Sequence, residues 1–453
     1  MRLTLPEPHI PEKGGFTSKN DIFGYRKFGE RLANLVSNIN EPLVITLDGS
    51  WGSGKSVFIK QWAGLMRKRG GKVVYFDAFA NDFHSNAFLA LASEIYSIAK
   101  KTLGKSNPST KEFLKSANKV VRVLASKGTD IALRLGTSGN VNLKDIRDVV
   151  KASENESEKV ISEQLQKANE ERASLKAFRD SLSDVSKSIA ENNQDASQFL
   201  PLVFIVDELD RCRPPFALEI LEHIKHLFSV ENVCFVLVTN LTQMEAIIKK
   251  TYGAETNAGT YLEKFYHHRI VLPKTKNGSQ KQRNEYLGYL WKNLNPVVIG
   301  HEGGELVRKE MLRLVNVHEL SLREIEHVLR NFILAGAAAE RNQLFVPPVV
   351  AGLCVMRLRD MKLYERAREN KLSWEDTYHF LKITAGSDDE SVKHREDVTG
   401  FWRYFVDQNA HNEESLSRYF NVLDNYNLPD GRLSSLHIFT NLIDNFADYY
   451  MPE

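Results

Sequence analysis

A glycine-rich segment that ends in lysine and serine carries the clearest chemical signal in the sequence. It has the pattern GxxxxGK[ST], in which backbone N–H groups wrap phosphates, the lysine contacts the β- and γ-phosphates and the last hydroxyl binds Mg²⁺. The residues expected to contact the nucleotide are Gly49, Ser50, Trp51, Gly52, Ser53, Gly54, Lys55, Ser56 and Val57, with Ser56 as a Mg²⁺ ligand. The segment therefore predicts a site for a nucleoside triphosphate with Mg²⁺.

Acidic residues that follow an apolar run further along the chain supply the other half of such a site. Asp207 and Glu208 directly follow Leu202–Val206, and Asp210 comes two positions later. We expect Asp207 to hold Mg²⁺, directly or through water, and Glu208 to deprotonate the water that attacks the γ-phosphate. Whether Glu208 or Asp210 is the base stays open. The pattern predicts hydrolysis of the bound nucleotide.

Two polar residues, Thr239 and Asn240, directly follow another apolar run, Val233–Val238. In this class of fold an amide or hydroxyl at that position senses the γ-phosphate, which makes Asn240 or Thr239 a candidate. Capping of the next helix is an equally good interpretation. No Asn-Lys-x-Asp pattern for guanine recognition follows, so ATP is the expected nucleotide.

Two arginines are candidates for charge neutralisation during phosphoryl transfer. Arg269 stands between an expected helix, Tyr261–His268, and an expected strand, Ile270–Leu272. In AAA-like folds a finger from this position reaches a neighbouring subunit, whereas a surface arginine at a helix C-terminus is the alternative. Arg323 opens an expected helix, Leu322–Arg330, and resembles a lid arginine, although a solvated helix-start residue would look the same.

Aromatic residues near the N-terminus are candidates for the adenine side of the site. Phe23 and Tyr25 precede an expected helix, Phe28–Ile39. They resemble the segment that packs on adenine in related NTPases. A plain lead-in to the helix is the alternative.

The elements that must position these residues follow from the apolar runs. Runs such as Leu43–Leu47 and Leu202–Val206 have the length and composition of buried parallel strands. A polar loop and a helix follow each of them. We therefore expect an α/β fold: a three-layer P-loop NTPase core with a mostly parallel sheet, a helical insertion, a helical lid and a helical C-terminal domain.

The combined motifs resemble the KAP family of P-loop NTPases over about residues 20–335. The matching segments are Asp207–Cys212 with Pro214, the expected helix Leu218–Phe228, and Tyr261–Phe265 leading into Ile270–Pro273. The chain departs from the family at Asp77 and Phe79, where an Asn-Ala-Trp run is usual, and at Glu208, where Asp is common. The family includes a phage-exclusion protein. The resemblance implies an ATP-driven conformational switch or motor in a larger assembly, in a setting of bacterial anti-phage defence.

The spacing of the motifs predicts five parts. About 150 residues separate Ser56 from Asp207, several tens more than a strand-helix-strand unit needs. We place the helical insertion at 101–196, between two halves of the core at 1–100 and 197–273. The helical lid is expected at 274–340 and the C-terminal domain at 341–453.

The insertion contains a narrow apolar seam. Apolar residues recur every seven positions at Ile161, Ala168, Leu175, Leu182 and Ile189, with Leu165, Phe178 and Val185 between them. This spacing predicts one amphipathic helix that packs on another helix of the insertion, on a second subunit or on a partner. An SMC- or Rad50-like DNA-tethering ATPase would also carry a coiled coil here, but no Leu-Ser-Gly-Gly-type loop precedes Leu202.

Composition limits the partners and the compartment. A net charge of +2 neither requires nor excludes nucleic acid or a membrane surface. Cys212, Cys234 and Cys354 have no CxxC spacing, which favours reduced core cysteines in a cytoplasmic protein. No window of 18 apolar residues predicts a membrane-spanning helix. His267 and His268 adjoin on an expected helix and form no metal signature.

The expected assembly is a homo-oligomer. A protein partner would bind through the helical insertion or the C-terminal helices. A scaffold that binds ATP without significant turnover is the alternative of a different class.

Overall fold

Five parallel strands form the sheet that the apolar runs predicted. In this computed structural model they are β1 (Leu43–Asp48), β2 (Val73–Asp77), β3 (Leu202–Asp207), β4 (Val233–Thr239) and β5 (His268–Val271), in the order β2-β3-β4-β1-β5. Every neighbouring pair is parallel. The carboxyl ends of the strands, where the candidate residues lie, therefore share one edge of the sheet. The predicted α/β class is confirmed.

The structure describes most of the chain. The described residues are 10–125 without 11, 19, 40 and 85, then 154–192, 200–273, 278–294, 303–339, 345–383, 389–407 and 435–445. They fall into two compact units, one that ends at Pro273 and one that begins at Gly278. Each unit has its own core and is described separately.

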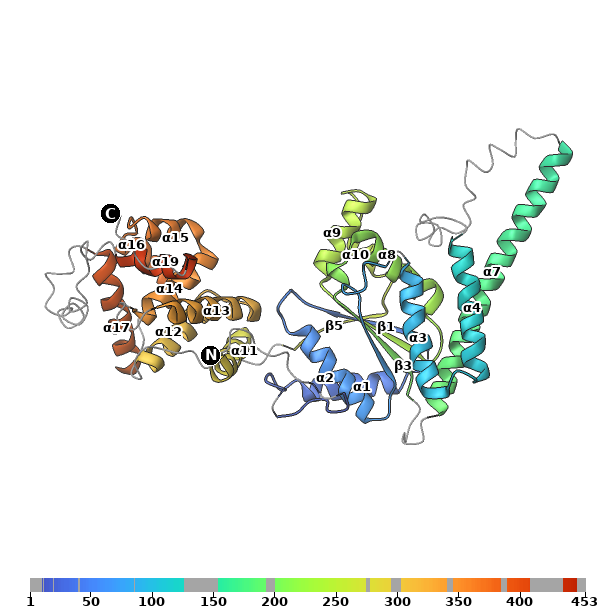
Figure 1. Ribbon diagram of the computed structural model, residues 1–453, viewed down its shortest axis with the longest axis horizontal. Helices are drawn as coiled ribbons and strands as arrows, with labels where there is room; N and C mark the ends of the chain where they lie inside the picture. The colour runs from blue at the N-terminus through green and yellow to red at the C-terminus, as the bar shows by residue number, and fades with distance from the viewer. Residues whose placement is uncertain are drawn as a thin grey trace. The chain divides into compact units, whose positions relative to one another are not determined.

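Helices cover both faces of the sheet (Figure 1). Alternate strand residues contribute to different cores: Ile45 and Ile205 join the core formed with α1 (Arg26–Ser37) and α2 (Lys55–Lys68), whereas Val44 and Phe204 join the opposite core. This alternation is the two-residue period of a pleated strand. The opposite layer contains α3 (Ala87–Leu103), α8 (Pro214–His223), α9 (Leu241–Tyr252) and α10 (Ala258–Leu262). The core is thus three layers deep.

Some expected element boundaries change in the structure. The expected helix Leu218–Phe228 belongs to α8, which starts at Pro214 and continues as a π-helical turn over Ile224–Phe228. The first helix, α1, runs Arg26–Ser37 in place of Phe28–Ile39. These shifts leave the order of the elements unchanged.

The expected helix Tyr261–His268 is wrong. The helix α10 ends at Leu262, and His268 already belongs to β5. The reason lies in the sheet: the His267 N–H donates to Val44 O at 2.8 Å, and the Val44 N–H donates back to His267 Nδ1 at 2.9 Å. These bonds draw the chain onto the edge of β1, so His268 lies in a strand, His267 lies in the bend before it, and neither lies on a helix.

The insertion forms a pair of helices, α4 (Pro108–Ala125) and α7 (Glu154–Glu191). Ser116 pairs with Ser181 at 2.6 Å and Ser109 with Ser188 at 3.1 Å, so the two helices run antiparallel. Four seam residues, Phe178, Leu182, Val185 and Ile189, are buried in the same core as α3 and α8. This half of the seam therefore packs within the chain.

The other half of the seam has a different environment. Leu165 is 61% exposed, and Ala168 and Leu175 are partly buried. The side chain of Ile161 lies outside the described part of the structure. Figure 1 shows α7 extending well beyond α4.

The second unit consists of helices in the described residues: α11 (Gly278–Leu294), α12 (Gly303–Val317), α13 (Leu322–Ala338), α14 (Pro347–Arg359), α15 (Met361–Arg368), α16 (Trp374–Leu381), α17 (Asp389–Val406) and α19 (Ser435–Asn445). The central helix α14 is buried from Pro348 to Met356. Its Gly352 lies against Trp402, where an added Cβ would meet the ring at 2.5 Å. Helices from the expected lid and from the expected C-terminal domain share this one core. Among the helices described, none is long and apolar enough to cross a membrane.

Candidate nucleotide-binding site

The glycine-rich loop connects β1 to α2 and requires its glycines. Gly52 and Gly54 have φ angles of 75° and 87°, in the left-handed region that favours glycine. At Gly49 an added Cβ would come within 3.0 Å of Ser53 Oγ. The Ser53 hydroxyl is buried without a hydrogen-bond partner in the described residues. A tight loop with an unsatisfied donor at the N-terminus of a helix suits a phosphate group.

Lys55 lies inside this loop. Its side chain is largely buried, and Nζ donates to Gly49 O at 2.5 Å and to Ser50 O at 3.0 Å. Burial lowers the pKa of the Lys55 ammonium, while Asp210, Asp207 and Asp48 act in the opposite direction. The ammonium is therefore held inside the loop that the sequence predicts to bind phosphate.

Asp207 and Ser56 meet at the expected Mg²⁺ position. Asp207 is only 1% exposed and accepts hydrogen bonds from the Ser56 hydroxyl, from Tyr75 OH at 2.7 Å and from the Glu208 N–H at 2.8 Å. Burial raises the pKa of the Asp207 carboxyl, and these hydrogen bonds oppose the shift.

No cluster of three acidic, histidine or cysteine ligands for a metal occurs among the described side chains. One hydroxyl and one carboxylate fit Mg²⁺, which takes its other ligands from phosphate and water.

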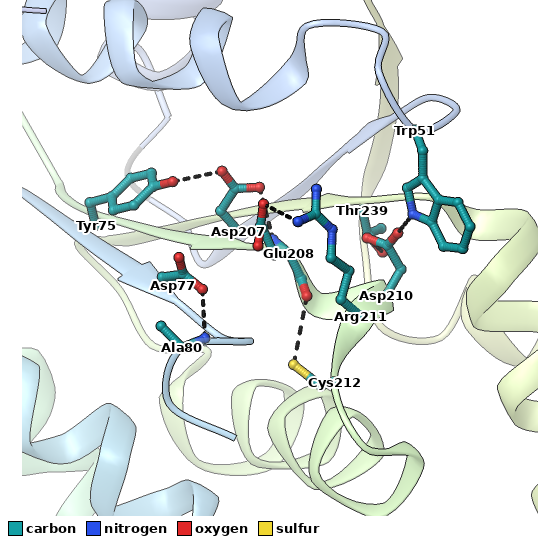
Figure 2. A network of polar contacts seen from close by, with 10 residues as sticks. All are labelled: Trp51, Tyr75, Asp77, Ala80, Asp207, Glu208, Asp210, Arg211, Cys212 and Thr239. Atoms are coloured by element: carbon teal, nitrogen blue, oxygen red, sulfur yellow. Dashed lines mark hydrogen bonds and ion pairs between the residues drawn. The ribbon is translucent and has the colours of Figure 1, made fainter. Parts of the chain in front are cut away.

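Glu208 has an unusual backbone and a charged partner (Figure 2). Its φ of 61° and ψ of 28° are left-handed, a conformation that is uncommon for a non-glycine residue and is concentrated at functional sites. Its Oε1 lies 2.8 Å from Arg211 Nη1, across the 3₁₀ turn Leu209–Arg211. Burial raises the pKa of Glu208 and Arg211 lowers it.

Asp210 joins the glycine-rich loop to β4. Its Oδ2 accepts from Trp51 Nε1 at 2.5 Å, and its Oδ1 accepts from Thr239 Oγ1 at 3.3 Å. Both carboxylate oxygens are thus engaged in holding neighbouring segments (Figure 2). Which of the two carboxylates, Glu208 or Asp210, acts as the base is still open, and the role of each stays a prediction.

Asn240 caps a helix. Its Oδ1 accepts from the Thr242 N–H at 3.1 Å at the start of α9. This is the capping arrangement that the sequence left open. The neighbouring Thr239 is buried and reaches Asp210, so of the two candidates Thr239 belongs to the polar network shown in Figure 2.

Arg269 lies on the edge strand β5, opposite Thr46 of β1. It is therefore not at a helix C-terminus, as one interpretation of the sequence held. Its Nη2 is 2.5 Å from Asp48 Oδ2, and Asp48 Oδ1 accepts from the Leu241 N–H at 2.9 Å. Asp48 directly precedes the glycine-rich loop, so Arg269 is paired with a residue that supports that loop, although its side chain is still 55% exposed.

The remaining candidates lie in different places. Tyr25 is buried with its ring centroid 5.8 Å from that of Phe58 and 5.6 Å from that of Phe23. Val57 is in the first turn of α2. Arg323 is an exposed residue at the start of α13, in the second unit. The roles of these four residues toward nucleotide stay predictions.

The structure adds residues that the sequence reasoning did not select as site residues. Tyr75 donates to Asp207, Arg211 pairs with Glu208, and Asp48 pairs with Arg269. Asp77 ends β2 directly beside Asp207 of β3. The sequence contained a signal for the aspartates among these residues. Carboxylates end three of the expected parallel strands, and parallel strands bring their carboxyl ends together.

Comparison with known proteins identifies a family for the chain. The family model described as the KAP family P-loop domain matches residues 25–335. No curated protein matches the chain. Among solved structures, the Aeropyrum pernix ORC2 protein in its ADPNP-ADP complexes is 14% identical with a TM-score of 0.36, and its ADP form is 12% identical with a TM-score of 0.35. Both alignments cover 97% of this chain and 96% of that chain.

The family match spans more than half of the chain. It includes the glycine-rich loop, the Asp207–Glu208 pair and all five strands of the sheet. The motifs, the parallel sheet and the matched range agree, and the chain belongs to the KAP family of P-loop NTPases.

Proposed function

We propose that the protein binds ATP with Mg²⁺ and hydrolyses it. The observation that carries this proposal is the contact between Ser56 and Asp207 beside the buried Lys55. These three residues come from two segments far apart in the chain, and their types match the needs of a magnesium triphosphate: a hydroxyl and a carboxylate for the metal, and a cation for the phosphates.

Each residue has a distinct task in this proposal. Backbone N–H groups of the Gly49–Ser56 loop and the Lys55 ammonium bind the phosphates. Ser56 and Asp207 would hold Mg²⁺, which neutralises charge on the β- and γ-phosphate oxygens. Glu208 takes the proton of the attacking water. Asp210 and Thr239 hold the glycine-rich loop next to the end of β4. Tyr75 orients the Asp207 carboxylate.

We further propose that hydrolysis drives a conformational switch in a homo-oligomer. Family membership supports this reading, and anti-phage defence in the bacterial cytoplasm is the setting that the family resemblance suggests. A partner would bind the α4–α7 pair or the helices of the second unit.

A second candidate function is an ATP-dependent scaffold without significant turnover. One observation favours it: the expected base, Glu208, is paired with Arg211. The Arg211 charge lowers the pKa of the Glu208 carboxyl, which opposes its action as a base.

One experiment separates the two functions. Steady-state phosphate release is measured with wild-type protein and with Glu208→Gln, alongside calorimetric binding of Mg²⁺-ATP to both. Binding with turnover that Glu208→Gln removes supports the ATPase. Binding without turnover supports the scaffold, and no binding by the wild type rejects both.

A further inference from the structure

The Glu208–Arg211 pair is built by a tight local turn. The Arg211 N–H donates to Glu208 O at 3.1 Å, which closes the turn and places the two side chains on the same side. The left-handed backbone of Glu208 is part of this turn. Because the residues are only three positions apart, the pair needs no movement of other elements in order to form or open.

The pair lies within a strongly acidic group of side chains. Burial is the main cause that raises the pKa of the Glu208 carboxyl; Arg211 lowers it, and the charges of Asp77, Asp207 and Asp210 raise it further. Asp210, the residue before Arg211, accepts a hydrogen bond from Trp51 of the glycine-rich loop at 2.5 Å. The turn that carries Arg211 therefore lies beside the loop that is expected to bind the phosphates.

A bound γ-phosphate would compete with Glu208 for this guanidinium. Phosphate carries more negative charge than a carboxylate and accepts the paired N–H donors of arginine in a bidentate arrangement. Arg211 is about one-third exposed, so its side chain is not locked by packing.

We propose that Arg211 is a latch on Glu208 that only a nucleoside triphosphate opens. Arg211 holds the base through the 2.8 Å contact between its Nη1 and Glu208 Oε1. When Mg²⁺-ATP binds, Arg211 moves to the γ-phosphate and frees Glu208 to accept a proton from water. ADP has no γ-phosphate, so the pair stays closed with ADP. This inference rests on the proposed function and adds to it a regulatory residue that distinguishes ATP from ADP.

Competition for one guanidinium makes a prediction about binding that does not depend on turnover. If Glu208 loses its charge, Arg211 is already free for the γ-phosphate, and triphosphate should bind more tightly. If Arg211 is removed, that gain should disappear. Neither substitution should change the affinity for the diphosphate much.

The test is a double-mutant cycle read by calorimetry. Dissociation constants for Mg²⁺-AMPPNP and Mg²⁺-ADP are measured for wild type, Glu208→Gln, Arg211→Met and the double variant. Glu208→Gln is expected to raise the affinity for AMPPNP over that for ADP by about fivefold, the scale of one partly exposed ion pair. Arg211→Met should lower this ratio, and the double variant should show no gain over Arg211→Met alone.

Two further variants serve as controls. Arg213→Met removes a nearby arginine that pairs with Asp82, and it should leave the AMPPNP to ADP ratio unchanged. Arg211→Lys keeps the charge without the bidentate donors and should restore part of the ratio. Circular dichroism confirms that each variant is folded, and Arg211→Gln, which also removes the charge, replaces Arg211→Met in the cycle if the latter is not.

The outcomes separate the latch from the proposed function. Equal effects on AMPPNP and ADP, or a gain from Glu208→Gln that persists without Arg211, would overturn the latch, while binding and hydrolysis by the wild type would still stand. A wild-type protein that binds neither nucleotide overturns both.

Discussion

At the scale of single residues, burial and charge conflict around the glycine-rich loop. Lys55 and Asp207 are both buried, and burial alone disfavours the charged form of each. Hydrogen bonds offset the cost of burying each charge. Carbonyl oxygens accept hydrogen bonds from Lys55, and Tyr75 and the Glu208 N–H donate hydrogen bonds to Asp207. The fold thus maintains a costly arrangement, which is typical of a functional site.

The first prediction concerns Lys55. Lys55→Ala should abolish detectable binding of Mg²⁺-ATP, since it removes the loop cation that contacts the β- and γ-phosphates. Isothermal titration calorimetry measures this directly. Lys68→Ala, at the exposed end of the same helix, is the matched control and should bind ATP as the wild type does. Unchanged affinity in a folded Lys55→Ala protein would contradict the phosphate-binding role.

The second prediction separates the base from the structural carboxylate. Glu208→Gln should retain ATP binding while phosphate release falls by about 10²-fold or more, the usual scale for a general base. Asp210→Asn should instead loosen the contact with Trp51, which tryptophan fluorescence can detect. If turnover survives in Glu208→Gln and vanishes in Asp210→Asn with Trp51 unperturbed, Asp210 is the base.

At the scale of elements, only part of the α4–α7 pair belongs to the core of the first unit. Leu182 of α7 is buried together with residues of α3 and α8, whereas Leu165 of the same helix is mostly exposed. Both positions are leucines on the same helix, α7. They differ in tertiary packing.

The third prediction uses this contrast. Leu182→Ala should destabilise the protein by about 2–5 kcal/mol, the range for a buried leucine that leaves a cavity. Leu165→Ala should change the stability by less than about 0.5 kcal/mol. Urea unfolding of both variants measures the difference. Equal destabilisation would mean that Leu165 is covered in solution, for example by a second subunit.

The contact between α8, α9 and α10 contains a buried acid. Glu222 accepts a hydrogen bond from Tyr252, which in turn lies 3.1 Å from Tyr261 OH. Burial raises the pKa of the Glu222 carboxyl from 4.5 to about 7. The folded protein therefore binds this proton more tightly than the unfolded chain does.

The fourth prediction follows by linkage. Because the folded pKa lies above the unfolded one, the contribution of Glu222 to stability is greatest below pH 4.5 and is lost as the pH rises toward 7. Glu222→Gln, which stays neutral, should flatten this part of the stability profile. Thermal unfolding of both proteins between pH 5 and pH 8 provides the test. Parallel profiles would show that Glu222 does not titrate in this range.

At the scale of the whole molecule, the question is whether one subunit completes the site of another. Arg269 lies on an edge strand with much of its side chain exposed, so it is accessible to a neighbour. It also pairs with Asp48 beside the glycine-rich loop of its own chain. The two roles make different predictions for the Arg269→Ala variant.

The fifth prediction is an ATP-dependent homo-oligomer in which Arg269→Ala lowers hydrolysis without lowering ATP affinity. Mixing Arg269→Ala subunits with Glu208→Gln subunits should then restore part of the activity, because some interfaces combine one intact site with one intact arginine. Light scattering with and without ATP reports the assembly. A monomer at micromolar protein, or a loss of ATP affinity in Arg269→Ala, would assign Arg269 to support of Asp48 within its own chain.

The sequence by itself determined the local chemistry of the site. A phosphate-binding loop needs glycines at fixed positions, a lysine and a hydroxyl within eight consecutive residues, and such a segment is recognisable without a fold. The acidic pair Asp207–Glu208 was recognisable for the same reason, because an apolar strand of the right length directly precedes it. Family membership followed from these short segments and was confirmed.

Only the tertiary structure decided which groups meet across the sheet edge. Tyr75 and Asp207 are 132 positions apart, and Arg269 and Asp48 are 221 apart, so their contacts depend on strand order, which spacing does not specify. The segment Tyr261–His268 was expected to be one helix, but the helix ends at Leu262 and the chain pairs with β1 from His267 onward. The seam of α7 reads the same along its length, yet packing covers its Phe178–Ile189 half, since burial depends on what lies opposite a helix face and not on the face itself.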